Sequence, residues 1–310
     1  MMNEEERKKL DEQLEQAKEA IYSLNKKKFL DDSTYNWTFG QNATAIEKNP
    51  LEEMKNYYRE ILEKINLSAV SLLIRTIEWG KGFFDAIELD NWLSAAASLR
   101  GAMESAGDAR ISLKKSIGFL IQEKKHLEEW LLCEGPKMPL NIYSYGEMEN
   151  LLNEFIFANR KQDNIRRGEP NLPEAKQNKV YIESLGESDG SEGVNKYKLY
   201  YAQLCELTHP SGIPIRMMFG NGDGEIKMNT MYDKTGMCEL FRMASAMCQR
   251  IFINPINLSL CLMRLLAVMN INPQNKIHKG MDLSNIFENN NVLRQAITVF
   301  GRENINRAGL

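Results

Sequence analysis

Cysteine and histidine are scarce in this chain of 310 residues, and their spacing limits the chemistry that it can carry. The five cysteines are odd in number and none belongs to a CxxC pair, so neither a disulfide framework nor a structural zinc site is indicated. The sequence also lacks HExxH, Walker A and GxSxG motifs. We therefore expect no metal and no cofactor, and a reducing cytoplasm fits the cysteine usage best.

Long apolar runs are missing as well. The N-terminus, MMNEEERKKLDEQ, is highly charged and has no apolar run of the kind that a signal peptide needs. The most apolar segment, 258–271, contains Arg264 and is shorter than the roughly 20 residues that span a bilayer. We expect a core helix there and no membrane association. The net charge of -3 argues against a chain-wide electrostatic grip on nucleic acid, although a local basic patch is compatible with it.

Apolar residues recur at helical spacing along most of the chain, and 43% of all residues are hydrophobic. This pattern predicts a mainly α fold, a helical bundle with a buried core. Alternating apolar residues around the turn sequence GNGDGE predict one small β-hairpin insertion within 213–231. The expected helices cover residues 4–28, a stretch from Pro50 that is one helix or two broken near Gly80 and Gly82, 91–132, 145–160, 195–209, 235–252, 256–270 and 291–302.

Three segments are expected along the chain. Residues 1–50 supply an N-terminal helix and a loop, 51–280 form the main helical domain, and 281–310 form a C-terminal helix and tail. Within the main domain, 161–195 is polar, rich in turn residues and almost empty of core residues. This composition predicts a long loop or insertion.

The first helix has a narrow apolar seam on an otherwise charged surface. Its members keep a 4-3-4-3 spacing, at Leu10, Leu14, Ala17, Ile21 and Leu24. Only about two heptads are present, fewer than the three or four that indicate a coiled coil. Docking on the body of the protein and a dimer seam are both compatible with this pattern.

The stretch 91–107 holds only two charges, Arg100 and Glu104. Their spacing puts them one turn apart on the same side of a helix. On a helical wheel they fall among apolar residues, whereas small residues at Ser94, Ser98, Gly101 and Ser105 would let a neighbouring backbone approach from the other side. We expect a partly buried ion pair, because an unpaired charge there would cost several kcal/mol.

Of the three histidines, we expect His126 and His278 to be solvated, whereas His209 ends a helix. Pro210 disfavours helix for the residue before it, and the helix dipole favours a protonated imidazole at this end. His209 is either a capping residue that binds the last carbonyls or a group that carries chemistry. Cys205 lies one turn earlier, but two ligands without a partner motif are a weak metal signal.

Two motifs, LRGAMESAGD (99–108) and YYAQLCELTHPSG (200–212), resemble bacterial helical proteins of the HEPN superfamily (higher eukaryotes and prokaryotes nucleotide-binding). The resemblance implies that 51–280 is an HEPN-like helical bundle that dimerises or binds a protein partner. In many members it implies metal-independent RNA cleavage in toxin–antitoxin or phage-defence systems. His209 matches the family histidine, and Arg100 and Glu104 match the polar pair on the earlier helix.

HEPN nucleases usually carry an arginine separated from the histidine by four to six residues, and the corresponding positions of this chain hold Ala202, Gln203 and Leu204. Cleavage therefore requires Arg100 to reach His209 in space. His209 would then act as general base or acid on the 2′-hydroxyl, Arg100 would stabilise phosphate charge, and Glu104 would orient Arg100.

The residues expected to contribute to binding around this set are Tyr200, Thr208 and Ser211. One alternative is a non-catalytic helical protein of the same fold that acts in interaction or assembly. Another is nucleotide or small-ligand binding at the same three polar residues. Proximity of Arg100 and His209 at a solvent-accessible place would favour catalysis or ligand binding, and proximity in a sealed core would favour the interaction protein.

Overall fold

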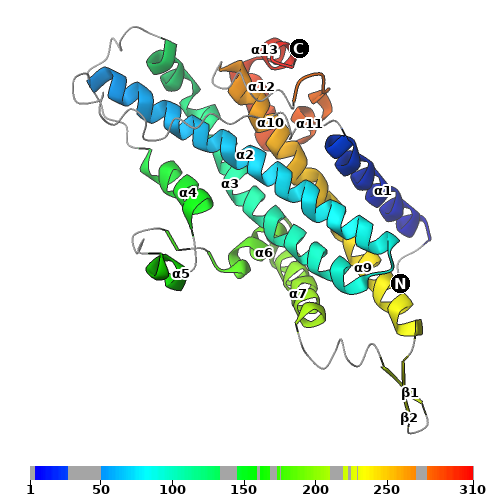
Figure 1. The fold of residues 1–310 in the computed structure, drawn as a ribbon. Coiled ribbons are helices and arrows are strands. Elements are labelled where there is room, and N and C mark those ends of the chain that lie inside the picture. The colour runs from blue at the N-terminus through cyan, green and yellow to red at the C-terminus, as the bar shows by residue number, and fades with distance from the viewer. Residues whose placement is uncertain are drawn as a thin grey trace. The chain divides into compact units, whose positions relative to one another are not determined.

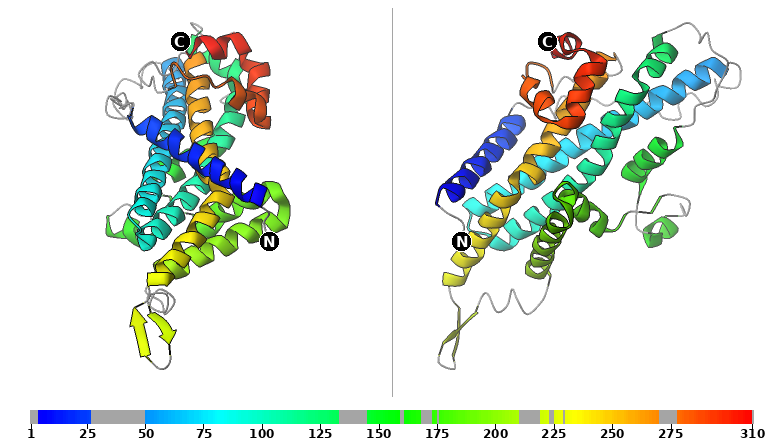
Figure 2. Two further views of the ribbon diagram at one scale, coloured as in Figure 1. Left: turned by 90° about the vertical axis from the view of Figure 1, so that its right-hand side faces the viewer. Right: turned by 180° about the vertical axis from the view of Figure 1, so that it is seen from behind.

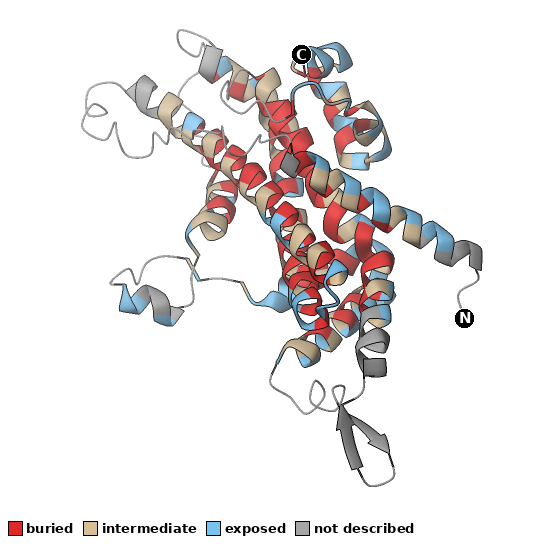
Figure 3. Cartoon of the chain, turned by 45° about the vertical axis from the view of Figure 1, so that its right-hand side comes forward, coloured by how far each residue is buried: buried red, intermediate tan, exposed pale blue. Residues whose placement is uncertain are grey.

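A computed structural model describes most of the chain, and it is mainly α-helical, as predicted (Figure 1). The described residues are 4–26, 50–132, 145–158, 161–167, 173–174, 176–209, 219–222, 225–228, 230–269 and 278–309. The loop predicted between the first two helices lies outside them. Buried residues run along α2, α3 and the stretch from α9 to α10 (Figure 3).

Contacts divide the chain into two compact units, which are treated separately below. The first unit takes 1–28, 72–110 and 177–256, and the second takes 29–71, 111–176 and 257–310. The predicted segment boundaries at 50 and 280 stay predictions.

The described residues form the helices α1 (Glu4–Lys26), α2 (Pro50–Glu88), α3 (Trp92–Leu132), α4 (Gly146–Phe157), α5 (Lys161–Arg166), α6 (Asn178–Gly186), α7 (Gly190–Thr208), α9 (Thr230–Cys248), α10 (Asn254–Val268), α11 (Ser284–Asn289), α12 (Asn291–Phe300) and α13 (Arg302–Arg307). A 3-10 turn, η2 (Glu187–Asp189), joins α6 to α7, and a π-helical turn, η3 (Gln249–Ile253), joins α9 to α10.

In the first unit, the seam of α1 is covered by the chain's own helices. Leu14, Ala17, Ile21 and Leu24 are buried, and α1 contacts α9 and η3. In the left view of Figure 2, α1 crosses the helix that contains α9, and in the right view it lies beside that helix. A side chain at Gly80 of α2 would clash with Ile21, so α1 also approaches α2 closely. The structure therefore favours docking on the body over a seam open to a second copy.

The second and third helices begin where the sequence indicates. α2 starts at Pro50 and continues through Gly80 and Gly82 as a single helix. Asn91 caps α3, because its Oδ1 accepts a hydrogen bond from the Ser94 N–H at 3.1 Å. Asp90 before it has a φ of 53°, a left-handed conformation that aspartate tolerates in turns.

The loop prediction for 161–195 is wrong over much of its length. Residues 161–166 form α5, residues 178–186 form α6, and α7 begins at Gly190 rather than near 195. Ile182 and Leu185 are buried and anchor α6. Glycines supply the rest of the packing, because a Cβ at Gly193 would lie 2.6 Å from the Gly186 carbonyl oxygen. Helices that pack through glycine backbone need few apolar side chains, so the sequence shows no helical spacing of apolar residues here.

The expected break at Pro255 is also absent, since α9, η3 and α10 follow one another without a gap. Proline lacks an N–H and disturbs an α-helical ladder. The π-helical turn just before it absorbs the disturbance, and the Asn254 N–H bonds to the Gln249 carbonyl five residues back. Part of this stretch, Cys238–Val268, is long and apolar enough to cross a membrane by composition alone. Since 72% of its most apolar window is buried, as in a core helix, it is only a weak indication of a membrane span.

Two short strands lie between α7 and α9. β1 (Phe219–Gly222) and β2 (Glu225–Met228) pair antiparallel, with Phe219 opposite Met228. Of the remaining residues of the predicted hairpin, 213–218, 223–224 and 229 lie outside the described residues, and 230–231 begin α9 instead.

In the second unit, the buried arginine Arg264 of α10 binds backbone carbonyls of the segment before α11 and of α13. The Arg264 side chain is 3% exposed, and its guanidinium donates to the carbonyl oxygens of His278 at 2.5 Å, Met281 at 3.0 Å and Ile305 at 3.2 Å. α12 confirms the helix predicted near 291–302, and the expected polar tail continues as α13.

Neither of the two histidines expected in solvent is fully solvated. His278 is 1% exposed, and burial, followed by the charges of Arg264 and Lys279, lowers its pKa to about 4. His126 is half-buried, with its Nε2 lying 3.4 Å from the Tyr58 hydroxyl and its ring beside Trp130. Tertiary neighbours, which the local sequence does not reveal, bury the ring of His278 and partly cover that of His126.

Candidate functional site

The site in the first unit begins with Arg100 and Glu104 on α3. The Arg100 Nε donates to the Glu104 Oε1 at 3.2 Å, and the two side chains are 26% and 28% exposed. The partly buried ion pair predicted from the sequence is therefore present. Its surroundings differ from the helical-wheel expectation.

From Ser98 onward the small-residue side of α3 is the more closely packed side, whereas Ser94 at its start is exposed. Ser98, Gly101 and Ser105 are buried, whereas Leu93 is 38% exposed. Gly101 faces an indole ring rather than a backbone, since a Cβ there would lie 2.5 Å from the Trp79 Cε2. Leucine usually prefers the core and serine the surface, and here the exposed Leu93 and the buried serines reverse that preference. The helical wheel therefore predicts the wrong side of α3 to be buried.

Glu104 is held by two residues besides Arg100. Its Oε1 accepts hydrogen bonds from the Tyr201 hydroxyl at 2.5 Å and from the Asn178 Nδ2 at 3.0 Å. Asn178 also donates to the Tyr201 hydroxyl at 2.8 Å. These four residues, Arg100, Glu104, Asn178 and Tyr201, are called the polar cluster below.

Asn178 reaches the polar cluster because α6 packs closely on α3. A side chain at Gly107 would clash with the Tyr181 carbonyl oxygen, and the Ser184 hydroxyl donates to the Gly107 carbonyl at 3.3 Å. The sequence gives no signal for Asn178, since it lies in the stretch expected to be a loop. The sequence does give a signal for Tyr201, because it precedes Thr208 by seven residues and therefore lies on the same side of α7.

Arg100 also extends from α3 to the end of α7. Its Nη1 donates to the Thr208 Oγ1 at 3.3 Å, and its Cζ lies 5.5 Å from the centre of the Tyr201 ring. Thr208 is the last residue of α7, and its hydroxyl donates back to the Leu204 carbonyl at 2.8 Å. The guanidinium is thus fixed beside the helix end at which His209 follows.

His209 occupies the C-cap position of α7, as predicted. Its backbone is extended, with φ of −85° and ψ of 152°, and its N–H donates to the Cys205 carbonyl at 2.9 Å. The side chain is exposed. Within the part of the chain that the structure describes, the imidazole makes no hydrogen bond to the last carbonyls of α7. The capping interaction therefore comes from the backbone of His209 and leaves its ring in solvent.

Of the two described residues that were expected to assist binding, Thr208 joins Arg100 and Tyr200 does not. Tyr200 is 8% exposed, and its ring lies 5.8 Å from the Lys196 Nζ. It has no described contact with the polar cluster. Ser211 lies outside the described residues.

The electrostatics of the polar cluster favour a fixed pair of charges. Burial and the hydrogen bond to Glu104 raise the pKa of Tyr201 to about 12, so the phenol stays protonated and donates at neutral pH. A protonated phenol is not a general base. Among the residues gathered here, the side chain whose chemistry suits proton transfer near neutrality is the imidazole of His209.

Among the described residues, no group of three or more histidine, cysteine or acidic side chains is placed to hold a metal ion. Cys205, expected as a weak partner of His209, is a half-buried free cysteine.

The protein-family models, the curated proteins and the solved structures contain no match to this chain. The functional assignment therefore depends on the two motifs and on the geometry just described.

Proposed function

We propose that this chain is an HEPN-like RNA-directed protein that cleaves RNA without a metal ion, in a bacterial defence or toxin setting. The observation that supports the proposal is the hydrogen bond from Arg100 to Thr208. It brings an arginine from α3 to the residue that precedes His209, although the usual arginine positions on α7 hold other residues. Both Arg100 and His209 have access to solvent.

The chemistry divides between these two side chains. His209 would take the proton from a ribose 2′-hydroxyl, whose oxygen attacks the neighbouring phosphorus and displaces the 5′-oxygen. The leaving oxygen takes up a proton, and a 2′,3′-cyclic phosphate remains. Arg100 would stabilise the charge on the phosphate oxygens, while Glu104, Tyr201 and Asn178 keep its guanidinium in place.

The decisive experiment is cleavage of total RNA in EDTA. The full chain is compared with His209→Ala and Arg100→Lys, and Arg307→Ala serves as the control because its side chain is 76% exposed on α13. We expect cleavage by the wild type and by the control. Loss of the imidazole should lower the rate by about 100-fold or more, the usual contribution of a general base. Far-UV circular dichroism establishes that each variant is folded.

Absence of cleavage by the folded wild type would overturn the nuclease proposal. Cleavage that survives His209→Ala unchanged would move the activity to another site.

A non-catalytic interaction or assembly protein of the same fold is the second candidate. It is supported by the fact that Arg100 already contacts Glu104, Tyr201 and Thr208. In that case the polar cluster holds α3 to α7 and the working form is a homo-oligomer or a complex with a protein partner in the cytoplasm. Wild type without cleavage, an early thermal melt of Arg100→Lys and a dimer mass by light scattering would together favour this candidate.

A further inference from the structure

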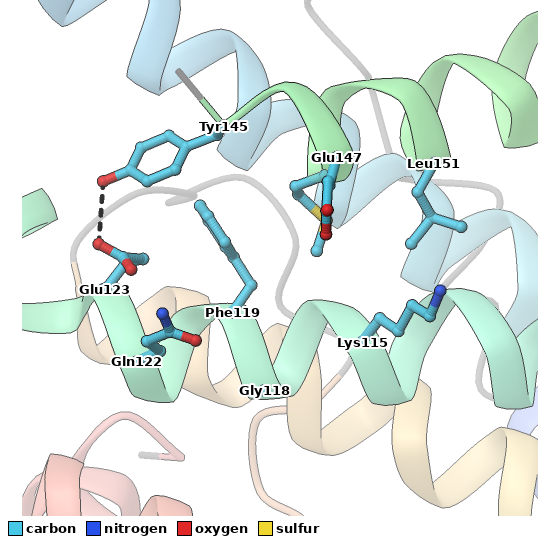
Figure 4. Close-up of a pocket in the computed structure, with 9 residues that line it drawn as sticks. Lys115, Gly118, Phe119, Gln122, Glu123, Tyr145, Glu147 and Leu151 are labelled. Atoms are coloured by element: carbon cyan, nitrogen blue, oxygen red, sulfur yellow. Dashed lines mark hydrogen bonds between the residues drawn. The ribbon is translucent and has the colours of Figure 1, made fainter. Parts of the chain in front are cut away.

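A cavity of about 510 Å³ lies in the second unit, between α3 and α4 (Figure 4). Gly118 and Phe119 line it from α3, and Met148 and Leu151 line it from α4. Its volume falls within the range of about 300 to 1,000 Å³ typical of small-molecule sites. The cavity shares no residue with the polar cluster of the first unit.

Gly118 is the unusual member of the lining. The other glycines in α3, Gly101 and Gly107, are explained by packing, since a side chain at either would collide with a neighbouring element. A Cβ at Gly118 would meet nothing within 4 Å. Glycine inside a helix costs about 1 kcal/mol relative to alanine. Packing against the described residues gives no reason for that loss, whereas Gly118 lines the cavity and a side chain there would occupy part of the open space beside it.

Aromatic rings form one end of the cavity. The centroids of Phe119 and Tyr145 lie 4.8 Å apart with their planes at 89°, so that the two rings present perpendicular walls. Met148 and Leu151 continue the apolar surface along α4. These side chains suit an apolar or aromatic body a few carbon atoms across.

Carboxylates outnumber cations around these rings. The Tyr145 hydroxyl donates to the Glu123 Oε2 at 3.2 Å, which fixes one carboxylate at the aromatic end. Glu147 projects from α4 toward the cavity, and Lys115 lies further along, below Leu151 (Figure 4). Among the described residues of the lining, two carboxylates and one ammonium give a net negative charge. Aromatic faces combined with carboxylates attract organic cations, through both the ring quadrupole and direct charge.

We propose that this cavity is a binding site for a small organic cation, an ammonium group attached to an apolar or aromatic body. The ammonium lies near Glu123 and against the rings of Phe119 and Tyr145. The body of the ligand extends along Met148 and passes over the backbone of Gly118, which the missing side chain leaves accessible.

The test measures binding of benzyltrimethylammonium to the full chain by isothermal titration calorimetry. Benzyl alcohol and benzoate, which share the ring but are neutral and anionic, are the comparison ligands. We expect the cation to bind about tenfold more tightly than benzyl alcohol, and benzoate to bind more weakly than either.

Two variants test whether benzyltrimethylammonium binds in this cavity. Gly118→Leu fills the cavity and should weaken binding of the cation at least tenfold, and Glu123→Gln should weaken it by a similar factor while leaving benzyl alcohol unaffected. The matched control is Gln295→Leu, which adds a leucine to an exposed position on α12. It should bind like the wild type.

Equal affinity for the cation and for benzyl alcohol would overturn the charge preference, and wild-type affinity in Gly118→Leu would overturn the location. If Gly118→Leu does not fold, undiminished binding by Glu123→Gln is sufficient to reject the proposal. RNA cleavage is scored separately at His209, so this site and the proposed nuclease site succeed or fail independently.

Discussion

At the scale of single residues, the centre of the polar cluster is one carboxylate oxygen. The Glu104 Oε1 accepts from the guanidinium of Arg100, the hydroxyl of Tyr201 and the amide of Asn178. Three donors on a half-buried oxygen fix the rotamer of Glu104, and Glu104 in turn limits the motion of Arg100. The position of Arg100 beside Thr208 therefore depends on residues from α6 and α7 as well as on its own helix.

The Tyr201→Phe variant tests that dependence. It removes one donor to Glu104 and the acceptor of Asn178, and hydrogen bonds to charged groups contribute about 1.5 to 3 kcal/mol. We expect the free energy of unfolding to fall by about 1 to 2 kcal/mol, because partial exposure weakens the interaction. Urea denaturation measures the change.

Tyr197→Phe is the matched control for this substitution. Tyr197 lies one turn earlier on α7, and its ring lies 5.6 Å from the guanidinium carbon of Arg250. Its hydroxyl has no described hydrogen bond, so the stability should change by a few tenths of a kcal/mol. Equal losses in the two variants would contradict a specific role for the Tyr201 hydroxyl.

At the scale of elements, we expect alanine substitutions at two glycines of α3 to change the stability of the protein in opposite directions. Gly107→Ala forces a methyl group against the backbone of Tyr181, and overpacking of this kind typically costs about 1 to 3 kcal/mol. Gly118→Ala meets open space and gains helix propensity, worth about 1 kcal/mol. Thermal melts should show a lower midpoint for the first variant and a midpoint raised by a few degrees for the second.

Each variant is the control of the other, because both make the same substitution in one helix. A raised midpoint for Gly107→Ala would mean that α6 does not pack against α3 at this point. A lowered midpoint for Gly118→Ala would mean that another group occupies the space beside it.

Elements with a regular apolar period could be predicted from the sequence, and those packed through backbone could not. The period located α1 and α12, and the proline that follows His209 located the end of α7. α6 was missed because it buries few apolar side chains, Ile182 and Leu185, and packs in addition through backbone contacts at Gly107 and Gly186. The π-helical turn before Pro255 was missed because it compensates for a proline that normally breaks a helix.

The candidate site divides in the same way. Arg100 and Glu104 could be found because two charges stand in an otherwise uncharged stretch, and their separation matches one helical turn. Tyr201 and Asn178 enter through contacts between helices that are far apart in the sequence. No local pattern indicates Asn178, whereas the sequence places Tyr201 on the same side of α7 as Thr208 without showing that it reaches Glu104.

At the scale of the whole molecule, stability should depend on pH through the buried His278. Its pKa is about 4 in the folded chain and near 6.5 when it is solvated, because burial and the charge of Arg264 disfavour the imidazolium. Between these values the unfolded chain binds a proton that the folded chain does not. Stability is therefore fully present above about pH 6.5 and is lost as the pH falls toward 4, by up to about 3 kcal/mol.

Urea midpoints measured from pH 8 to pH 4 test this dependence in the wild type, in His278→Phe and in His209→Ala. The Phe variant loses the titrating group, so its midpoints should vary less between pH 6.5 and pH 4. His209→Ala should keep the wild-type slope, because the His209 side chain is exposed. The carboxylate of Asp189, whose pKa Arg250 lowers through a hydrogen bond, loses its contribution only at more acidic pH. A wild-type slope that persists in His278→Phe would show that another group titrates in this window, and the buried histidine would then not control the acid stability of the protein.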